Sequence, residues 1–259
     1  MATFLFENIV FGPVKSRRLG SSLGINLLPN NSKICNYNCI YCECGWTGEG
    51  LPQDNRFHPR IEVGNRLANK LEEMKVNNQV LDVITFAGNG EPTMHPEFET
   101  IIDDTIIIRD LHFPSARIAV LSNASMTARD NVFRALQKVD DNILKLDSAF
   151  EQTIQLMNQP KFRFNLLTLV NNLKRFKGDF ILQTMFLKGK YKNVAFDNTS
   201  EKERKAWLGI VEDLSPKMVM LYTIARDTPH QELEKINIET LNSIASEVGK
   251  LGIKVQVSG

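Results

Sequence analysis

All four cysteines of the chain lie within ten residues, at Cys35, Cys39, Cys42 and Cys44. Disulfides between cysteines this close would close only tiny loops, so the crowding indicates a metal site in a reducing compartment. The first three have the spacing C-x3-C-x2-C. Three thiolates on a short loop can each bind one iron of a four-iron, four-sulfur cluster and leave the fourth iron open to a cofactor or substrate.

A structural zinc site is the alternative for these cysteines. Such sites usually combine two separated C-x2-4-C pairs, and the second pair is missing here. Cys44 is left over from the three-cysteine motif. We expect it to be an incidental thiol of the CECG turn, although a structural thiol beside the cluster or a hydrogen-atom donor are alternatives.

The elements that must position this loop alternate along the chain. Apolar, β-branched segments predict buried strands at residues 23–28, 81–88, 117–123, 142–148, 179–187, 217–225 and 253–257. Helical spacing predicts helices at residues 63–76, 97–110, 128–139, 162–176, 201–214 and 238–251. Because parallel strands need crossover helices, the order predicts an α/β fold with a parallel sheet and outer helices, curved into a partial (β/α)6 barrel. An open doubly wound sheet is the alternative.

We expect residues 1–259 to form a single domain. Residues 1–30 would supply an N-terminal segment and the first strand, and residues 31–50 would supply the cysteine loop.

Polar residues follow several predicted strands, at the end where parallel sheets bind ligands. In the segment GNGEP (88–92), Gly88 and Gly90 permit a sharp turn with positive φ. The carbonyls of this turn and Glu91 could accept hydrogen bonds from a cationic amino group. We expect Asn89 to tolerate the left-handed conformation there, as asparagine does more readily than most residues.

The motif C-x3-C-x-aromatic-C, in which the aromatic residue is Tyr41, resembles the signature of the radical S-adenosylmethionine (SAM) superfamily. Within it, the chain is similar to the compact iron–sulfur proteins related to wyosine synthases. The similarity is carried by residues 11–29, 35–45, 86–98, 121–124 and 144–148.

The resemblance implies one 4Fe–4S cluster held by Cys35, Cys39 and Cys42, with SAM on the open iron. One electron from a flavodoxin or ferredoxin would cleave SAM, giving a 5′-deoxyadenosyl radical that abstracts hydrogen from a substrate. The resemblance assigns the following residues to SAM binding: Tyr41, Gly88, Asn89, Gly90, Glu91, Ser122, Asn123, Lys145, Asp147, Ser148, Gln183 and Met185. For those at strand ends, capping of the following helix is the alternative.

Four residues near the same strand ends are expected to contact the substrate: Arg17, Arg18, Tyr222 and Arg226. A guanidinium is planar and always charged, so it could hold a carboxylate, a phosphate or a flat heterocycle. A solvated turn is the alternative for Arg17 and Arg18.

Charge and cysteine count limit the function. With 31 Lys and Arg against 30 Asp and Glu, the net charge of +1 predicts no stable binding of nucleic acid. No apolar run reaches the ~18 residues of a membrane span, and a signal peptide is not evident, so we expect no membrane contact and a cytoplasmic location. Because the four cysteines leave no ligands for an auxiliary cluster, we do not expect the activities of wyosine synthase or methylthiotransferases.

We therefore expect a lyase or oxidoreductase that acts on a small molecule, for example a modified nucleobase or nucleoside. A lyase of the kind that salvages queuine is one candidate. The alternatives are a tRNA base modifier, a glycyl-radical activase with a protein partner, and a non-enzymatic iron–sulfur electron carrier.

Overall fold

The computed structural model describes residues 4–16, 18–48 and 57–259. One sheet of the described chain contains, in spatial order, β1 (Val10–Ser16), β2 (Gly20–Ile25), β3 (Val83–Phe86), β4 (Arg117–Ser122), β5 (Asp141–Lys145), β6 (Ile181–Met185), β9 (Met218–Tyr222) and β11 (Lys254–Ser258). Strands β2 to β11 of this sheet pair in parallel, and β1 pairs with β2 antiparallel. The strands predicted from apolar runs are thus all present, and β1 is an addition.

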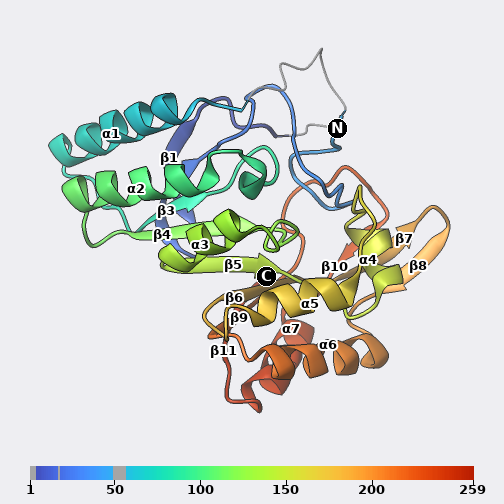
Figure 1. Cartoon of the computed structure of the whole chain (residues 1–259). Coiled ribbons are helices and arrows are strands. Elements are labelled where there is room, and N and C mark those ends of the chain that lie inside the picture. The colour runs from blue at the N-terminus through green and yellow to red at the C-terminus, as the bar shows by residue number, and fades with distance from the viewer. Residues whose placement is uncertain (1–3, 17, 49–56) are drawn as a thin grey trace.

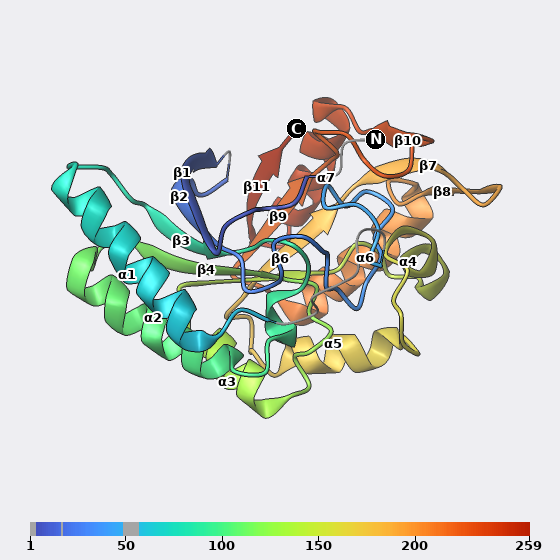
Figure 2. The same ribbon diagram turned by 90° about the horizontal axis from the view of Figure 1, so that it is seen from above.

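Helices connect the parallel strands and lie outside the curved sheet. They are α1 (Arg60–Val76), α2 (Phe98–His112), α3 (Asp130–Lys138), α4 (Glu151–Met157), α5 (Leu166–Lys174), α6 (Glu201–Leu214) and α7 (Ile238–Gly249). A 3₁₀ turn, η1 (Pro92–Met94), precedes α2. Figure 1 gives the arrangement, and Figure 2 shows α1, α2 and α3 side by side along the outer face of the sheet. The predicted partial barrel is confirmed. The open doubly wound alternative is wrong, because the sheet curls and its helices stay outside.

Two layers of side chains line the inner face of the barrel. The lower layer, here called the floor, is apolar and includes Ile143 and Ile181, and the layer above it is more polar. Parallel partners in register share a face, so Ile143 and Ile181 point the same way, as do Lys145 and Gln183 one step further along. The floor residues pack with Leu19 and neighbouring apolar side chains in a cluster of their own. Strand alternation therefore directs Lys145 and Gln183 to the inner face, near the carboxyl ends of their strands.

The turn of the β1–β2 hairpin reaches across this inner face. Gln256 of β11 donates from Nε2 to the carbonyl of Arg18 at 3.1 Å, and Leu19 packs into the inner apolar cluster. The first and last strands of the parallel sheet are thereby linked through the hairpin turn, which places Arg18 above the inner face. Arg17, a predicted substrate residue, lies outside the described residues.

A small antiparallel sheet lies beside the barrel, in the order β10 (Leu233–Lys235), β7 (Leu187–Tyr191) and β8 (Val194–Asp197). The sequence KGKYK (188–192) is typical of a solvated basic loop, but residues 188–191 of it belong to β7. Gly189 lets the backbones approach, since a Cβ there would lie 2.2 Å from the carbonyl oxygen of Glu232. Over the part of the chain that is described, no helix has the length and apolarity needed to cross a membrane.

Candidate active site

The cysteine loop between β2 and α1 is fastened to the GNGEP turn after β3. Ile34, the residue before Cys35, donates its N–H to the carbonyl of Asn89 at 2.9 Å and accepts from the N–H of Glu91 at 3.0 Å. A Cβ on Gly90, whose φ is 139°, would lie only 1.8 Å from the carbonyl oxygen of Ile34. Only glycine permits this approach, and the turn therefore fixes Cys35 at the carboxyl end of β3.

Amide groups donate to the cysteine sulfurs. Asn158 Nδ2 lies 3.5 Å from Cys39 Sγ, and Asn123 Nδ2 lies 3.6 Å from Cys35 Sγ. The backbone N–H of Tyr37 also donates to Cys35 Sγ, at 3.4 Å. Such donors stabilise thiolate sulfur and tune a cluster held by it.

Cys42 is the most readily ionised thiol of the loop. Interaction with the Cys44 thiol, opposed by burial and aided by the positive charge of Lys33, lowers the pKa of Cys42. Burial raises the pKa of Cys35 and Cys39. Lys33 is itself buried and donates to the carbonyl of Gly45 at 2.7 Å. One cation is therefore built in beside the loop, where it would offset thiolate charge.

The donor set suits a four-iron cluster better than a single ion. Among the described residues, no three His, Cys, Asp or Glu side chains are placed to share one metal ion. Thiolate ligands of a four-iron cluster bind different irons, so they surround the cluster and need not converge on one point. A structural zinc ion requires four ligands around one centre, so the arrangement argues against zinc. Cys44 instead directs its Sγ to the carbonyl of Gly88, at 3.4 Å.

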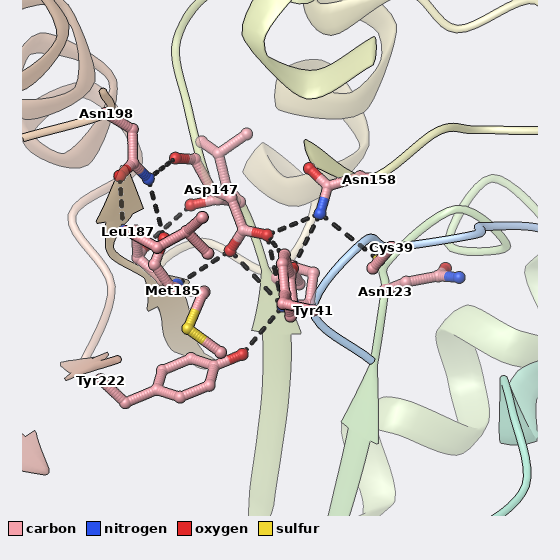
Figure 3. Close-up of polar contacts among 12 residues, drawn as sticks. Cys39, Tyr41, Asn123, Asp147, Asn158, Met185, Leu187, Asn198 and Tyr222 are labelled. Atoms are coloured by element: carbon pink, nitrogen blue, oxygen red, sulfur yellow. Dashed lines mark hydrogen bonds and ion pairs between the residues drawn. The ribbon is translucent and has the colours of Figure 1, made fainter. Parts of the chain in front are cut away.

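A buried polar network lies beside Cys39, around Asp147 (Figure 3). One carboxylate oxygen of Asp147 accepts from Tyr41 OH and from Asn158 Nδ2, the latter at 2.6 Å. The other accepts from the N–H of Met185 at 2.9 Å. Lys145 Nζ donates to both phenolic oxygens, those of Tyr41 and Tyr222, at 2.9 Å each. These hydrogen bonds join three side chains that were expected to lie near one another at the strand ends: Tyr41, Lys145 and Asp147.

The charges of this network follow from burial and pairing. Burial raises the pKa of Tyr41 well above its usual value, and the neighbouring carboxylate of Asp147 adds to the effect. For Lys145, burial disfavours the ammonium, but Asp147, Tyr222 and Cys39 together outweigh burial and raise the pKa. Tyr41 therefore stays neutral and Lys145 stays charged, so Lys145 acts only as a donor.

Asn158, the residue that ends α4, was not predicted. Its Nδ2 contacts Cys39, Tyr41 and Asp147 together. No local pattern marks this residue, since an asparagine at a helix end usually serves as a cap.

Several predicted SAM residues are instead used within the protein. The Glu91 carboxylate is buried and accepts from Thr93, from Ser122 Oγ at 2.8 Å and from the N–H of Asn123 at 2.7 Å. Among the described residues, Oε2 receives only the N–H of Asn123 and keeps a second lone pair, so the expected role of Glu91 as an acceptor for a ligand stays a prediction. Ser148 is not brought into the network either, because its hydroxyl donates to Glu203 of α6 at 2.6 Å.

Asn89 also departs from expectation. Its φ is not positive, so it does not adopt the left-handed conformation that was predicted for it. Its side chain is fully buried. Nδ2 donates to the carbonyls of Phe6 at 2.9 Å and Pro29 at 2.8 Å, and Oδ1 accepts from the N–H of Phe6 at 2.8 Å. Asn89 therefore anchors the N-terminal segment, which requires a side chain that glycine lacks.

Three of the predicted substrate-side residues come together: Arg18, Tyr222 and Arg226. The guanidinium carbon of Arg18 lies 5.0 Å from the ring centroid of Tyr222. Arg226 pairs with Glu43 of the cysteine loop, with 2.6 Å between Nη1 and Oε2. Tyr41 and Met185 line the same small cavity as Arg18, Tyr222 and Arg226. A larger cavity of about 640 Å³ on the inner face shares Arg18 and Arg226 with it.

Residues 31–192 match the Radical SAM superfamily. The chain belongs to this superfamily. Superfamily members bind SAM and a 4Fe–4S cluster, which confirms the two expected cofactors; the residues assigned to each stay predictions.

Among curated proteins, the chain is 31% identical over 236 residues to the "GTPase Obg" of Brachyspira hyodysenteriae, covering 90% of this chain and 32% of that protein. It is 29% identical to the UPF0026 protein MJ1312 of Methanocaldococcus jannaschii, covering 95% of this chain and 74% of that protein. The UPF0026 protein slr1464 of Synechocystis is 27% identical, with 95% of both chains covered. The chain thus spans about a third of the Brachyspira protein.

Solved structures of radical SAM proteins share the fold. A radical SAM methyltransferase from Sphaerobacter thermophilus superposes with a TM-score of 0.67 at 14% identity, covering 92% of this chain and 65% of that one. Streptococcus suis SuiB bound to S-adenosylmethionine gives 0.63 at 12% identity, covering 88% and 49%. Archaeal TYW1 gives 0.53 at 11% identity, covering 88% and 71%. These similarities confirm the partial barrel.

Proposed function

We propose that this radical SAM enzyme holds its cluster through Cys35, Cys39 and Cys42 and acts on a small substrate bound inside the barrel. The observation that carries the proposal is the position of the loop. Cys39 contacts the polar network of Tyr41, Asp147 and Lys145 through Asn158. That network borders the small cavity, which shares Arg18 and Arg226 with the larger cavity on the inner face.

When bound, the cluster and SAM supply one-electron reductive cleavage of the sulfonium to methionine and a 5′-deoxyadenosyl radical, which abstracts a hydrogen atom from the substrate. The protein residues supply position and shielding. Asn158 and Asn123 orient the cysteine sulfurs, and the charged Lys145 fixes Tyr41 and Tyr222 beside the cavity. The apolar floor below limits the access of water to reactive species.

The size of the inner cavity favours a small molecule over a macromolecule. About 640 Å³ lies in the range of small-molecule sites, about 300–1,000 Å³. The net charge of +1 also favours a small substrate over tRNA. A modified nucleobase or nucleoside would fit both observations. Lyase and oxidoreductase outcomes differ in the fate of the substrate radical, so product analysis distinguishes them.

We infer further that a flavodoxin or ferredoxin supplies the electron and that the enzyme works in the cytoplasm, since free thiols persist in a reducing compartment.

The experiment is anaerobic reconstitution, with iron and sulfide measured before SAM and dithionite are added. We expect four irons per chain, as for any 4Fe–4S cluster, and 5′-deoxyadenosine only when both reagents are present. A full cluster without that product contradicts the proposal. Steeply salt-dependent binding to tRNA would instead favour a macromolecular substrate.

A further inference from the structure

The inner cavity is open because the strand residues that face it are small. Its lining includes Ser22 and Gly24 of β2, Thr85 of β3 and Ala87 just after it. Larger residues at these positions would fill the space, as Ile143 and Ile181 do on the floor. The upper part of the barrel is therefore shaped to hold a ligand rather than to complete the core.

One side of this cavity is an aromatic wall formed by Phe4, Phe6 and Phe11 of the N-terminal segment. The rings of Phe6 and Phe11 are stacked, with centroids 3.8 Å apart and planes 22° apart, and Phe4 meets Phe6 edge-on. Phe11 lies against Gly24, since a Cβ on Gly24 would be 2.1 Å from Phe11 Cζ. The three aromatic side chains therefore present an apolar surface to the cavity.

The aromatic wall is fixed to the elements around the cysteine loop. Asn89 holds both backbone polar groups of Phe6, and the N–H of Phe4 donates to the carbonyl of Glu43 at 3.1 Å. Its position is thus set by the same turn and loop that carry the proposed cofactor residues.

Arg18 lines the cavity and has a guanidinium nitrogen without an acceptor in the described part of the chain. Its Nη1 is buried and has no hydrogen-bond partner among the described residues. By contrast, Arg226 at the same cavity is paired with Glu43. A buried N–H without an acceptor is costly, so a ligand that supplies one would be favoured. Lys15 also lines the cavity, and the cations there outnumber the acids, Glu43 and Asp227.

We propose that the substrate is a flat ring compound with an acidic oxygen group, a carboxylate or a phosphate. Its ring packs on the aromatic wall, and its acidic group accepts hydrogen bonds from Arg18, whose fork geometry suits such groups. This inference rests on the proposed function in that the ligand of the cavity is the substrate of the radical reaction.

The test is equilibrium dialysis of the anaerobically reconstituted holoenzyme with saturating SAM. The probes are matched acidic and neutral pairs: nicotinate and nicotinamide, orotate and uracil, uridine 5′-monophosphate and uridine. We expect an acid to bind at least about tenfold more tightly than its neutral partner, a difference of about 1.4 kcal/mol. A preference confined to the nucleotide identifies phosphate as the acidic group, and one confined to the other pairs identifies carboxylate.

Variants show whether Arg18 is responsible. In Arg18→Gln the preference should fall below about twofold, whereas Arg129→Gln, an exposed arginine before α3, should keep it. Equal binding within all three pairs, a preference that survives Arg18→Gln, or displacement of SAM by the acids contradicts the proposal.

A second measurement does not depend on the choice of probe. Arg18→Met should leave the melting temperature unchanged or raised, because the substitution removes a buried donor that lacks a partner. A fall of more than about 4 °C, roughly 1 kcal/mol or more for a chain of this size, would show that the guanidinium serves the fold instead. Failure of the proposed function is visible separately, as acid binding without formation of 5′-deoxyadenosine.

Discussion

Asn158 donates a hydrogen bond from Nδ2 to the Sγ of Cys39, over 3.5 Å. The same nitrogen lies 2.6 Å from the carboxylate of Asp147 and 2.8 Å from the hydroxyl of Tyr41. The end of α4 is thereby joined to the middle cysteine of the motif and to the end of β5. One amide group therefore links the proposed cluster ligand with the network beside the cavity.

Replacing Asn158 should change the cluster more than the fold. A hydrogen bond to sulfur favours the reduced, more negative cluster, so Asn158→Ala should shift the midpoint potential to more negative values. An EPR-monitored redox titration of the reconstituted protein measures this shift. Asn171→Ala, at an exposed position of α5, is the matched control. An unchanged potential in Asn158→Ala would show that the amide does not act on the cluster.

We expect three of the four cysteines to be needed for cluster assembly and Cys44 to be dispensable. Cys39→Ser should abolish cluster assembly, because one of three ligands is lost, whereas Cys44→Ser should retain iron and sulfide near the wild-type level. Cys44 donates to the carbonyl of Gly88 and lies outside the three-cysteine spacing. Iron and sulfide analysis after anaerobic reconstitution measures both variants. An equal loss of iron and sulfide in Cys39→Ser and Cys44→Ser would contradict the assignment of three cysteine ligands.

Asn89→Gly should loosen the N-terminal segment. The substitution removes the three hydrogen bonds that Asn89 makes to Phe6 and Pro29. We expect a stability loss of about 1–3 kcal/mol and faster amide exchange around Phe6. Denaturant unfolding and hydrogen exchange with mass spectrometry measure the two effects. Asn65→Gly, on the exposed side of α1, controls for the glycine itself and should leave exchange at Phe6 unchanged.

Acidification should weaken the turn before α2 through His95. Burial lowers the pKa of His95 below 6.5, and its Nδ1 accepts from the N–H of Glu97 at 3.1 Å, which only a neutral ring can do. Because the folded pKa is depressed, the unfolded chain binds more protons once the pH falls to about 6.5. Stability should therefore decline as the pH falls from about 7 through the depressed folded pKa.

The His95→Gln variant isolates this contribution. The drop in unfolding free energy between pH 7 and pH 5.5 should be smaller in the variant than in the wild type, as measured by urea unfolding at each pH. An identical or larger drop in the variant would assign the pH dependence to other groups.

The repeating part of the fold could be predicted from the sequence, because short segments rich in apolar, β-branched residues, such as 81–88, mark its parallel strands. Strand β1 was missed because Gly12 and Pro13 interrupt its apolar pattern. Strand β7 was missed because Leu187–Tyr191 alternates with lysines and reads as a solvated loop. Strand β1 pairs with its sequence neighbour β2, and β7 pairs with its neighbour β8 and with the more distant β10. Only the pairing with β10 depends on a segment far along the chain.

The candidate site could be predicted where chemistry depends on spacing, as at Cys35, Cys39 and Cys42, or on position at a strand end, as at Lys145. The site could not be predicted where a side chain forms hydrogen bonds with a segment that is distant in the sequence. Glu91 is held by Ser122 and Asn123 of the next strand end, and Asn158 meets Cys39 only in the folded chain.

The central claim is that this chain cleaves SAM at a cluster held by three cysteines. Its most direct measurement is 5′-deoxyadenosine formed by the anaerobically reconstituted protein, quantified by liquid chromatography with SAM and dithionite present. We predict product in the wild type and in Cys44→Ser, and none in Cys39→Ser or without dithionite. A wild-type protein with a full complement of iron and sulfide that forms no 5′-deoxyadenosine would contradict the claim.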